Sequence, residues 1–324
     1  MPSTEADAGP LWCALLAMQR HDWEQGVASH AAIDDGDSAL ARLIAHDAIV
    51  RQDAQGRLGA TGDAGPVNAG ALGEAVALVA SAGNRDAAAA LDRQRWWLLR
   101  HAPRAESGVL YHLEGRPEVW VDTVYMVVPF LAVTGDFAPA DMQYRMHRQH
   151  LWNPETGLYG HRFDVEADAW VRDAPWASGN GWVAAGLARA LHIGGDSVPP
   201  EMRGRWRAQA RALIDACTPH ARADGRFHDV LDDPSSFVDG TAGLMLAYAA
   251  HTGIVDGWLP ETYARRADTW MDGALARVDD LGLVREVCGA PTFDRQGTSA
   301  EAQAFAIMAL AARSRADATR RNAA

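Results

Sequence analysis

One aspartate interrupts an otherwise uncharged and largely apolar stretch, VWVDTVYMVVPFL (119–131). Asp122 is followed by Tyr125 and Met126, at spacings of three and four residues that place all three on one helical face. Trp120 stands two residues before it. Aromatic neighbours desolvate a carboxyl group and favour its protonated form, which prepares it for general acid catalysis near neutral pH. The alternative is that Asp122 caps the helix that starts here, and the position alone fits both interpretations.

Other carboxyl groups lie near the starts of predicted helices. Asp22 and Glu24 open one of these helices and are the next most plausible acid–base candidates. Asp239, in FVDGTAG, fits an N-cap better than a catalytic group. Glu301 stands three residues after Thr298, which is the capping-box spacing, and we interpret it as structural.

Tryptophan is unusually frequent, with 12 residues against 7 Phe and 6 Tyr. A tryptophan offers a flat apolar face and one N–H donor, a combination that suits the C–H face and the hydroxyls of a sugar ring. For any single tryptophan a place in the core is the alternative. Four of them fall at equivalent helix starts, which favours a common role in binding: Trp23, Trp120, Trp176 and Trp182.

Two histidines, His112 and His161, end equivalent turns after VLY and LYG. Either could bind a substrate hydroxyl or carboxylate, although an isolated histidine is more often simply hydrogen-bonded. The histidines and cysteines match no metal-ligand spacing, so we expect neither a metal nor another cofactor.

The elements that must position these residues are mainly helical, because the apolar residues recur at helical spacing and hardly any stretch alternates like a strand. A polar turn with a glycine and a short β-prone piece recurs five times, with glycines 49 to 68 residues apart. This spacing indicates an array of helix pairs. The five turns are DAQGRLG (53–59), ESGVLYH (106–112), ETGLYGH (155–161), ADGRFHD (223–229) and DDLGLVR (279–285).

We count twelve helices in six pairs. The second helices, such as 85–100 and 200–216, carry charge on one face and indicate an outer layer. The first helices are apolar on most sides and indicate an inner layer. An open array needs polar ends, which the sequence lacks, so we predict closure into an all-α (α/α)6 barrel with short β-hairpin turns at its mouth. The six first helices are predicted to start near Trp23, Asn68, Trp120, Ala177, Val238 and Ser299.

The predicted barrel is one catalytic domain over residues 1–324, with frayed ends at 1–9 and 314–324. Helix N-termini that converge on the mouth favour an anionic ligand there.

Composition limits the classes of function. The formal charge is −12 and all 30 basic residues are arginines, which excludes lysine Schiff bases and lysine phosphate loops. An acidic chain without a basic cluster is a poor binder of nucleic acid or of membrane surfaces. No stretch is apolar enough to span a membrane, and the start has no signal-peptide pattern. Three scattered cysteines are expected to be buried thiols, so we predict a cytoplasmic protein; the sequence does not indicate its oligomeric state.

Four segments together resemble glycoside hydrolase family 105, the unsaturated rhamnogalacturonyl hydrolases, which are relatives of the unsaturated glucuronyl hydrolases of family 88. The resemblance extends in order from about residue 12 to 312 and implies the six-hairpin (α/α)6 fold. The segments are HDWEQGVASHAAI (21–33), WVDTVYMVVPFLA (120–132), PWASGNGWVAAGLARAL (175–191) and SAEAQAFAIMALAA (299–312).

The resemblance implies a substrate with a 4,5-unsaturated uronic acid at its non-reducing end. One carboxylic acid protonates C4, water adds at C5, and the hemiketal that results opens and expels the leaving sugar. This chemistry needs one carboxyl group, unlike ordinary glycosidases. Asp122 matches the family's catalytic aspartate and Trp120 its neighbour in the pocket, which favours the catalytic interpretation over the cap.

The sequence departs from the family pattern at two positions. Ser178 stands where many members have an arginine before the G-x-G-W piece, and Asn68 is the nearest match to a second expected aspartate. Losing one charge of each sign indicates an altered subsite, in which Arg162 or Arg172 could supply the missing positive charge. The predicted substrate-binding residues are Trp23, Asn68, Trp120, Tyr125, Met126, His161, Trp176, Ser178, Asn180 and Trp182.

Two other functions stay open at this point. A sugar epimerase or lyase on the same barrel is one, motivated by the changes at Ser178 and Asn68. A carbohydrate-binding protein without turnover is the other, because a fold does not fix a function.

Overall fold

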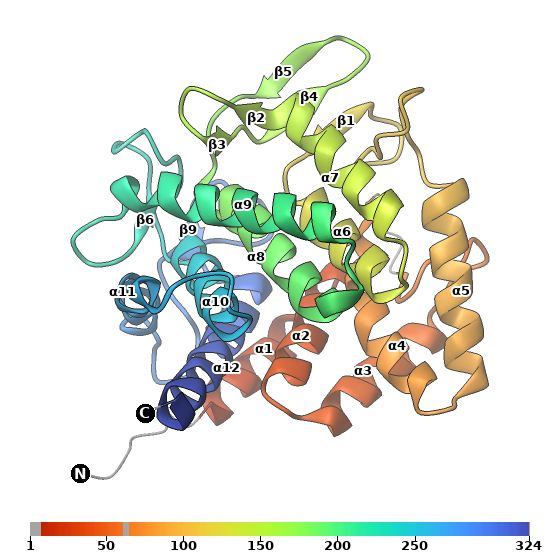
Figure 1. Cartoon of the computed structure of the whole chain (residues 1–324), viewed down its shortest axis with the longest axis horizontal. Coiled ribbons are helices and arrows are strands. Elements are labelled where there is room, and N and C mark those ends of the chain that lie inside the picture. Colours follow the sequence, from red (N-terminus) through yellow and green to blue (C-terminus); the bar gives the residue numbers. More distant parts are fainter. Residues whose placement is uncertain (1–7, 61–64, 324) are drawn as a thin grey trace.

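The predicted helical barrel is present in the computed structural model of the protein, which describes residues 8–60 and 65–323 (Figure 1). Within these residues there are twelve α-helices. The inner helices are α2 (Asp22–Asp34), the 3-10 turn η1 (Asn68–Leu72) continued by α4 (Gly73–Ser81), α6 (Thr123–Val133), α8 (Ala177–Gly194), α10 (Thr241–Val255) and α12 (Ala300–Ala323). The outer helices are α1 (Gly9–Met18), α3 (Ser38–Val50), α5 (Arg85–Arg100), α7 (Phe137–Leu151), α9 (Pro200–Cys217) and α11 (Ala264–Leu275).

The inner helices form a closed ring, as predicted. Each packs against the next in chain order, and α12 packs against α2 to complete the circle. Burial on every side explains why these segments are apolar nearly all round: every residue of α8 from 177 to 191 is buried. The outer helices α5 and α9 bury one face only, in agreement with the charged face predicted for each.

In the sixth helix pair the outer helix does not follow the inner helix along the chain. Its outer member is α1, from the beginning of the chain, which packs against α12 near the end (Figure 1). The Gln303 side chain ties the two together by donating to the backbone carbonyl of Leu11. At the other end of the chain α12 continues to Ala323, so helix extends through most of the stretch 314–324 in which a frayed end is predicted. Of the other predicted frayed end, residues 1–7 lie outside the described residues and Gly9 begins α1.

The glycines of the five predicted turns share a left-handed backbone conformation. Gly56, Gly108, Gly157, Gly225 and Gly282 all have φ between +71° and +99°, a region that side chains disfavour. This requirement explains why glycine recurs at equivalent places in the repeat.

Four of the five turns lead into short strands at the end of the barrel where the inner helices begin, as predicted (Figure 1). In the described residues the turn 53–59 is followed by η1 and not by a strand. The largest sheet is three-stranded and antiparallel, in the order β1-β4-β5. The strands are β1 (Glu118–Trp120), β2 (Trp152–Asn153), β3 (Leu158–Tyr159), β4 (Arg162–Asp164), β5 (Ala169–Arg172), β6 (Phe227–His228), β7 (Val238–Asp239), β8 (Val287–Cys288) and β9 (Gln296–Gly297). The remaining 3-10 turns are η2 (Gly195–Ser197), η3 (Thr218–His220) and η4 (Glu261–Tyr263).

Two further properties bear on the predictions from composition. No helix in the described residues is long and apolar enough to cross a membrane. Cys217 and Cys288 are buried as predicted, but Cys13 is exposed, because α1 buries only the face that carries Leu11, Ala14 and Leu15.

Candidate active site

A cavity of about 610 Å³ opens at the mouth of the barrel, where the inner helices start. It combines carboxyl groups, histidines, arginines and tryptophans, which is the mixture expected of a carbohydrate site. Its lining residues are Trp23, Asn68, His112, Leu113, Trp120, Asp122, Met126, His161, Arg162, Arg172, Trp176, Trp182, Asp229, Pro291, Thr292, Phe293, Asp294 and Glu301.

Asp122 stands at the N-terminus of α6 but does not cap it. Its side chain accepts no hydrogen bond from the helix, although its position is that of the N-cap residue. Oδ1 is buried and has no hydrogen-bond partner in the described structure. Oδ2 lies 3.6 Å from Nε2 of His112. The carboxyl group therefore faces the cavity and makes no hydrogen bond to its own helix.

The residues beside Asp122 are held rigidly. His112 shares a hydrogen bond of 2.8 Å between its Nδ1 and Oγ1 of Thr123, the first residue of α6. Its ring stacks on Trp120, with centroids 4.4 Å apart and planes within 6° of each other. The indole N–H of Trp120 donates to Glu118 at 2.8 Å. These contacts fix one wall of the cavity before any ligand arrives.

The three-stranded sheet brings two arginines to the same wall. Trp120 of β1 pairs with Arg162 of β4, and Arg162 pairs with Arg172 of β5. Directly opposed residues of antiparallel strands lie on one face of a sheet, so all three side chains point the same way. The Arg162 guanidinium carbon lies 5.0 Å from the centre of the Trp120 ring.

The two arginines differ in their partners. Arg172 donates to Nδ1 of His161 at 2.9 Å and contacts a carboxylate oxygen of Asp229 at 3.3 Å. Arg162 makes no ion pair with any described residue, and its Nε is buried without a hydrogen-bond partner. Arg162 is thus a cation available to an incoming anion.

Burial changes the ionisation of two groups in this wall. It lowers the pKa of His161 well below its usual value, and the charges of Arg172 and Arg162 lower it further. His161 is therefore neutral and accepts a hydrogen bond from Arg172. Burial also raises the pKa of Asp229, helped by the nearby Asp239 and opposed by Arg172.

The remaining wall is largely aromatic. Trp176 precedes α8 and packs against His161, with ring centroids 4.7 Å apart. Trp182, one and a half turns into α8, is nearly fully buried at the base of the cavity. Trp23 packs against Phe293 of the loop between β8 and β9.

Asn68 reaches the cavity because η1 lies very close to α6. A Cβ atom at Gly70 would overlap the backbone carbonyl of Met126, so only glycine permits this approach. Met126 itself also lines the cavity.

Seven of the ten predicted substrate-binding residues therefore line the cavity, and three lie behind it. Tyr125 is fully buried, and its hydroxyl is 2.8 Å from Nδ1 of His30. Ser178 is fully buried and donates to Asp239 at 2.6 Å. Asn180 hydrogen-bonds the backbone of Tyr159. The structure gives these three residues packing and hydrogen-bonding roles instead of contact with the cavity.

The carboxyl groups near the other helix starts are also placed by the structure. Glu24 forms a capping box with His21, so it is a helix cap and not an acid–base group. Asp22 is buried and accepts from the backbone N–H of Trp23 at 2.8 Å. Asp239 is not the N-cap residue that was predicted, because it ends β7 and Gly240 holds the N-cap position of α10; its Oδ1 accepts the backbone N–H of Thr241 at 2.8 Å.

The prediction for Glu301 as a purely structural cap is wrong. Its side chain lines the cavity, and Ser299 is the residue whose hydroxyl accepts from a backbone N–H of the first turn of α12. Asp229 was not predicted at all. A signal for it existed, since Asp229 ends the turn ADGRFHD as His112 and His161 end theirs.

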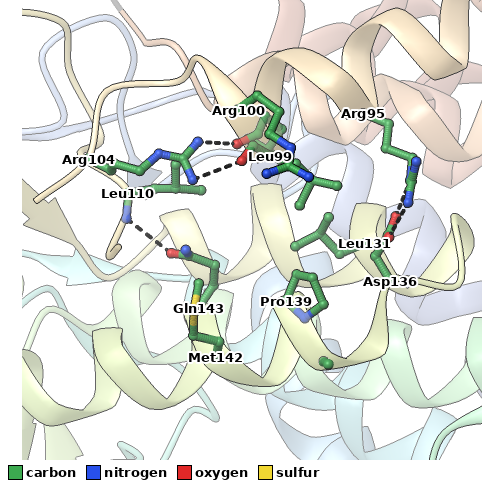
Figure 2. Close-up of a pocket in the computed structure, with 12 residues that line it drawn as sticks. Arg95, Leu99, Arg100, Arg104, Leu110, Leu131, Asp136, Pro139, Met142 and Gln143 are labelled. Atoms are coloured by element: carbon green, nitrogen blue, oxygen red, sulfur yellow. Dashed lines mark hydrogen bonds and ion pairs between the residues drawn. The ribbon is translucent and has the colours of Figure 1, made fainter. Parts of the chain in front are cut away.

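A second cavity, of about 520 Å³, lies outside the barrel between α5 and α7 (Figure 2). Most of its polar groups are already engaged. Arg104 donates to the backbone carbonyls of Leu98 and Leu99, and Arg95 pairs with Asp136. The cavity has neither a histidine nor an unpaired carboxyl group in its lining, so we place the candidate active site at the barrel mouth.

The described residues contain no cluster of three His, Cys, Asp or Glu side chains that could hold a metal ion.

A closed ring of six inner helices, with carboxyl groups and tryptophans at its mouth, defines a carbohydrate-active (α/α)6 barrel. The chain belongs to glycosyl hydrolase family 88, whose model matches residues 16–313. The resemblance to unsaturated uronyl hydrolases inferred from the sequence is thereby confirmed.

Individual relatives agree with this assignment. The chain is 28% identical over 200 residues to the unsaturated rhamnogalacturonyl hydrolase YesR of Bacillus subtilis. That match spans 56% of this chain and 57% of the relative, little more than half the length of each.

Two solved structures share the fold. A possible member of family GH105 from Klebsiella pneumoniae has a TM-score of 0.79 and 23% identity, over 90% of this chain and 81% of that one. A family 105 glycoside hydrolase from C. acetobutylicum has a TM-score of 0.80 and 16% identity, over 95% and 99%. At these identities the likeness establishes the fold alone.

Proposed function

We propose that the protein hydrolyses oligosaccharides that carry a 4,5-unsaturated uronic acid at the non-reducing end, with Asp122 as general acid and base. Membership of family 88 and the similarity to YesR support this substrate class. The observation that carries the proposal is the carboxyl group of Asp122. It faces a cavity lined by tryptophans, and one of its oxygens is buried without a partner.

The reaction needs a single proton donor and acceptor. Asp122 gives its proton to C4 of the unsaturated ring, which leaves positive charge at C5 and on the ring oxygen. Water then adds at C5 and returns a proton to the Asp122 carboxylate. The hemiketal formed in this way opens and releases the leaving sugar. Asp122 ends the cycle protonated, so one carboxyl group suffices.

The uronate carboxylate needs a cation, and Arg162 is suited to supply it. Its guanidinium group has no ion pair with a described residue and lies over Trp120, two residues before Asp122. Arg172 lies beside it, with part of its charge engaged by Asp229. We infer that Arg162 takes the place of the arginine that Ser178 replaces. The tryptophans supply flat faces for the sugar rings.

The proposal is tested by incubating the purified protein with unsaturated disaccharides from polysaccharide lyase digests. We expect loss of the ultraviolet absorbance of the conjugated acid, with products that together contain one added water. If the absorbance does not fall with any of several uronic acids and linkages, the proposal is wrong.

A lyase or epimerase is the second candidate, because the cavity also contains His112 and His161, which could serve as a proton donor and acceptor. Such an enzyme would exchange a ring proton with deuterated solvent without adding water. Retention of the absorbance together with deuterium in the sugar ring would favour it.

We also propose that the whole chain acts as one catalytic domain and that it works in the cytoplasm. Limited proteolysis, which should give no stable fragment, and cell fractionation test these two points.

A further inference from the structure

Glu301 lies in the first turn of α12, directly across the ring from Asp122. The inner helices follow the order α2, α4, α6, α8, α10, α12, so α6 and α12 are three places apart in a ring of six. Both residues line the same cavity. Glu301 is 98% buried, and its Oε2 atom has no hydrogen-bond partner in the described structure.

The groups around Glu301 are unfavourable to a negative charge. Glu24, on α2, accepts two backbone N–H groups. Asp239, at the end of β7, accepts two backbone N–H groups and the Ser178 hydroxyl. The thiol of Cys288, on β8, is also close. The other charged or titratable groups in the cavity wall are Asp122, Asp229, Asp294, His112, His161, Arg162 and Arg172.

These surroundings keep Glu301 protonated near neutral pH. Burial raises its pKa to about 8, with further contributions from Glu24 and Asp239. Its own backbone N–H and the Ser299 hydroxyl act in the opposite direction but do not offset the rise.

A structural role does not explain a carboxyl group at this place. Ser299 already supplies the helix cap, and a buried oxygen without a partner costs about 1–3 kcal/mol. An apolar side chain of similar size would fill the same volume without that cost. The arrangement is costly in the free protein and becomes favourable only when a ligand supplies the missing partner.

We propose that Glu301 is a substrate-contacting residue, which donates a hydrogen bond to an oxygen of the bound sugar from the wall opposite Asp122. The inference rests on the proposed function, because the substrate is taken to be anionic. An uncharged acid at this position offers a donor without repelling the uronate, whereas an ionised one would add a negative charge next to it.

The inference predicts a specific pH dependence. Below pH about 8 Glu301 is protonated and donates. As the pH rises through that value the group ionises, the hydrogen bond is lost and the uronate is repelled, so KM should rise. A glutamine keeps a donor and cannot ionise.

The experiment compares KM for one unsaturated disaccharide between pH 6 and 9.5 in wild type, Glu301→Gln, Glu301→Ala and the control Glu24→Gln. We expect Glu301→Ala to raise KM about tenfold at pH 7, the amount that one lost hydrogen bond implies. Glu301→Gln should keep KM within about threefold at pH 7 and remove the alkaline rise. Glu24→Gln removes a neighbouring carboxylate that caps its own helix, so it should lower the melting temperature and leave KM at pH 6 unchanged. The alkaline rise in KM should begin at a lower pH than in wild type, because one charge that raises the pKa of Glu301 is lost.

The possible outcomes separate the two proposals. Turnover by the wild type supports the hydrolase whatever Glu301 does. If turnover is present and Glu301→Ala has an unchanged KM, or Glu301→Gln keeps the alkaline rise, the assignment of Glu301 is overturned. If Glu301→Ala does not fold, the pH profile of the isosteric Glu301→Gln decides alone. A wild type inactive on every unsaturated substrate overturns the proposed function and this inference together.

Discussion

Replacing Arg162 by methionine tests how the protein recognises a uronate. Methionine keeps most of the side-chain length and removes the charge. In the structure this guanidinium lies 5.0 Å from the centre of the Trp120 ring and makes no ion pair with a described residue. A charge-assisted hydrogen bond to a carboxylate contributes about 1.5–3 kcal/mol. At 1.4 kcal/mol per decade, Arg162→Met should therefore raise KM roughly 10- to 150-fold.

The assay compares an unsaturated disaccharide with its methyl ester, which lacks the charge. We expect wild type to favour the acid strongly. Arg162→Met should raise KM for the acid by the amount given above and change KM for the ester by less than about threefold, because the ester never used the charge.

A matched control is Arg148→Met, since Arg148 also lies over a tryptophan ring, at 4.7 Å from the centre of Trp152, but outside the cavity. Each variant loses one cation–π contact, worth about 0.5–1 kcal/mol of stability. Arg148→Met should show that loss, together with the loss of its hydrogen bond to Gln209, without any change in KM. Equal changes for acid and ester in Arg162→Met would refute the assignment of Arg162 as the carboxylate-binding residue.

The remaining predictions concern stability. Asn180→Ala should lower the free energy of unfolding by about 1–3 kcal/mol, because it leaves the Tyr159 N–H without a partner. Denaturant titration should show this loss while kcat/KM stays within about twofold, and a loss of activity at full stability would contradict the prediction. Arg189→Met removes the positive charge that pairs with buried carboxylates of α2 and α4. The same titration should show a free energy of unfolding lower by about 3–5 kcal/mol, and a decrease of less than about 1 kcal/mol would contradict this. Glu301→Gln should be more stable than wild type at pH 7 to 9. The pKa of Glu301 is raised to about 8 in the folded protein, above its value in the unfolded chain. Wild type therefore loses stability as the pH rises through the range in which Glu301 is ionised in the unfolded chain but still protonated in the folded protein. Equal melting temperatures of wild type and variant at pH 8 would argue against this prediction.

Much of the fold follows from local features of the sequence. The inner-helix starts predicted from the repeated turns and the apolar runs after them lie within about three residues of those in the structure. The turn glycines were recognisable because a positive φ demands that residue at each repeat. Closure of the ring was predictable from the absence of polar ends.

The pairing of α1 with α12 was not predictable in the same way. It joins the two ends of the chain, and no local pattern indicates which helix completes the sixth pair. Only packing in three dimensions decides it.

The sequence predicted which helix starts carry the site, but not how far along the barrel axis each side chain lies. Helical spacing from Asp122 predicted Tyr125 at the site, and the segment PWASGNGW of the family resemblance predicted Asn180. Neither signal gives the height of a side chain along the barrel axis, and both side chains are buried outside the lining of the cavity. The prediction for Glu301 was wrong for a different reason. Its spacing from Thr298 fits a capping box, whereas its actual surroundings come from α2 and β7.

The most direct test of the central claim is the rate of absorbance loss with Asp122→Asn. Asparagine preserves the size of the side chain and cannot carry the proton to C4. We expect kcat to fall by at least about a thousandfold, toward the upper end of the effect of removing a general acid–base group. Calorimetry should show that the variant still binds the substrate, because the tryptophans and Arg162 are unchanged. An Asp122→Asn protein with wild-type kcat would contradict the assignment of Asp122 as the catalytic residue.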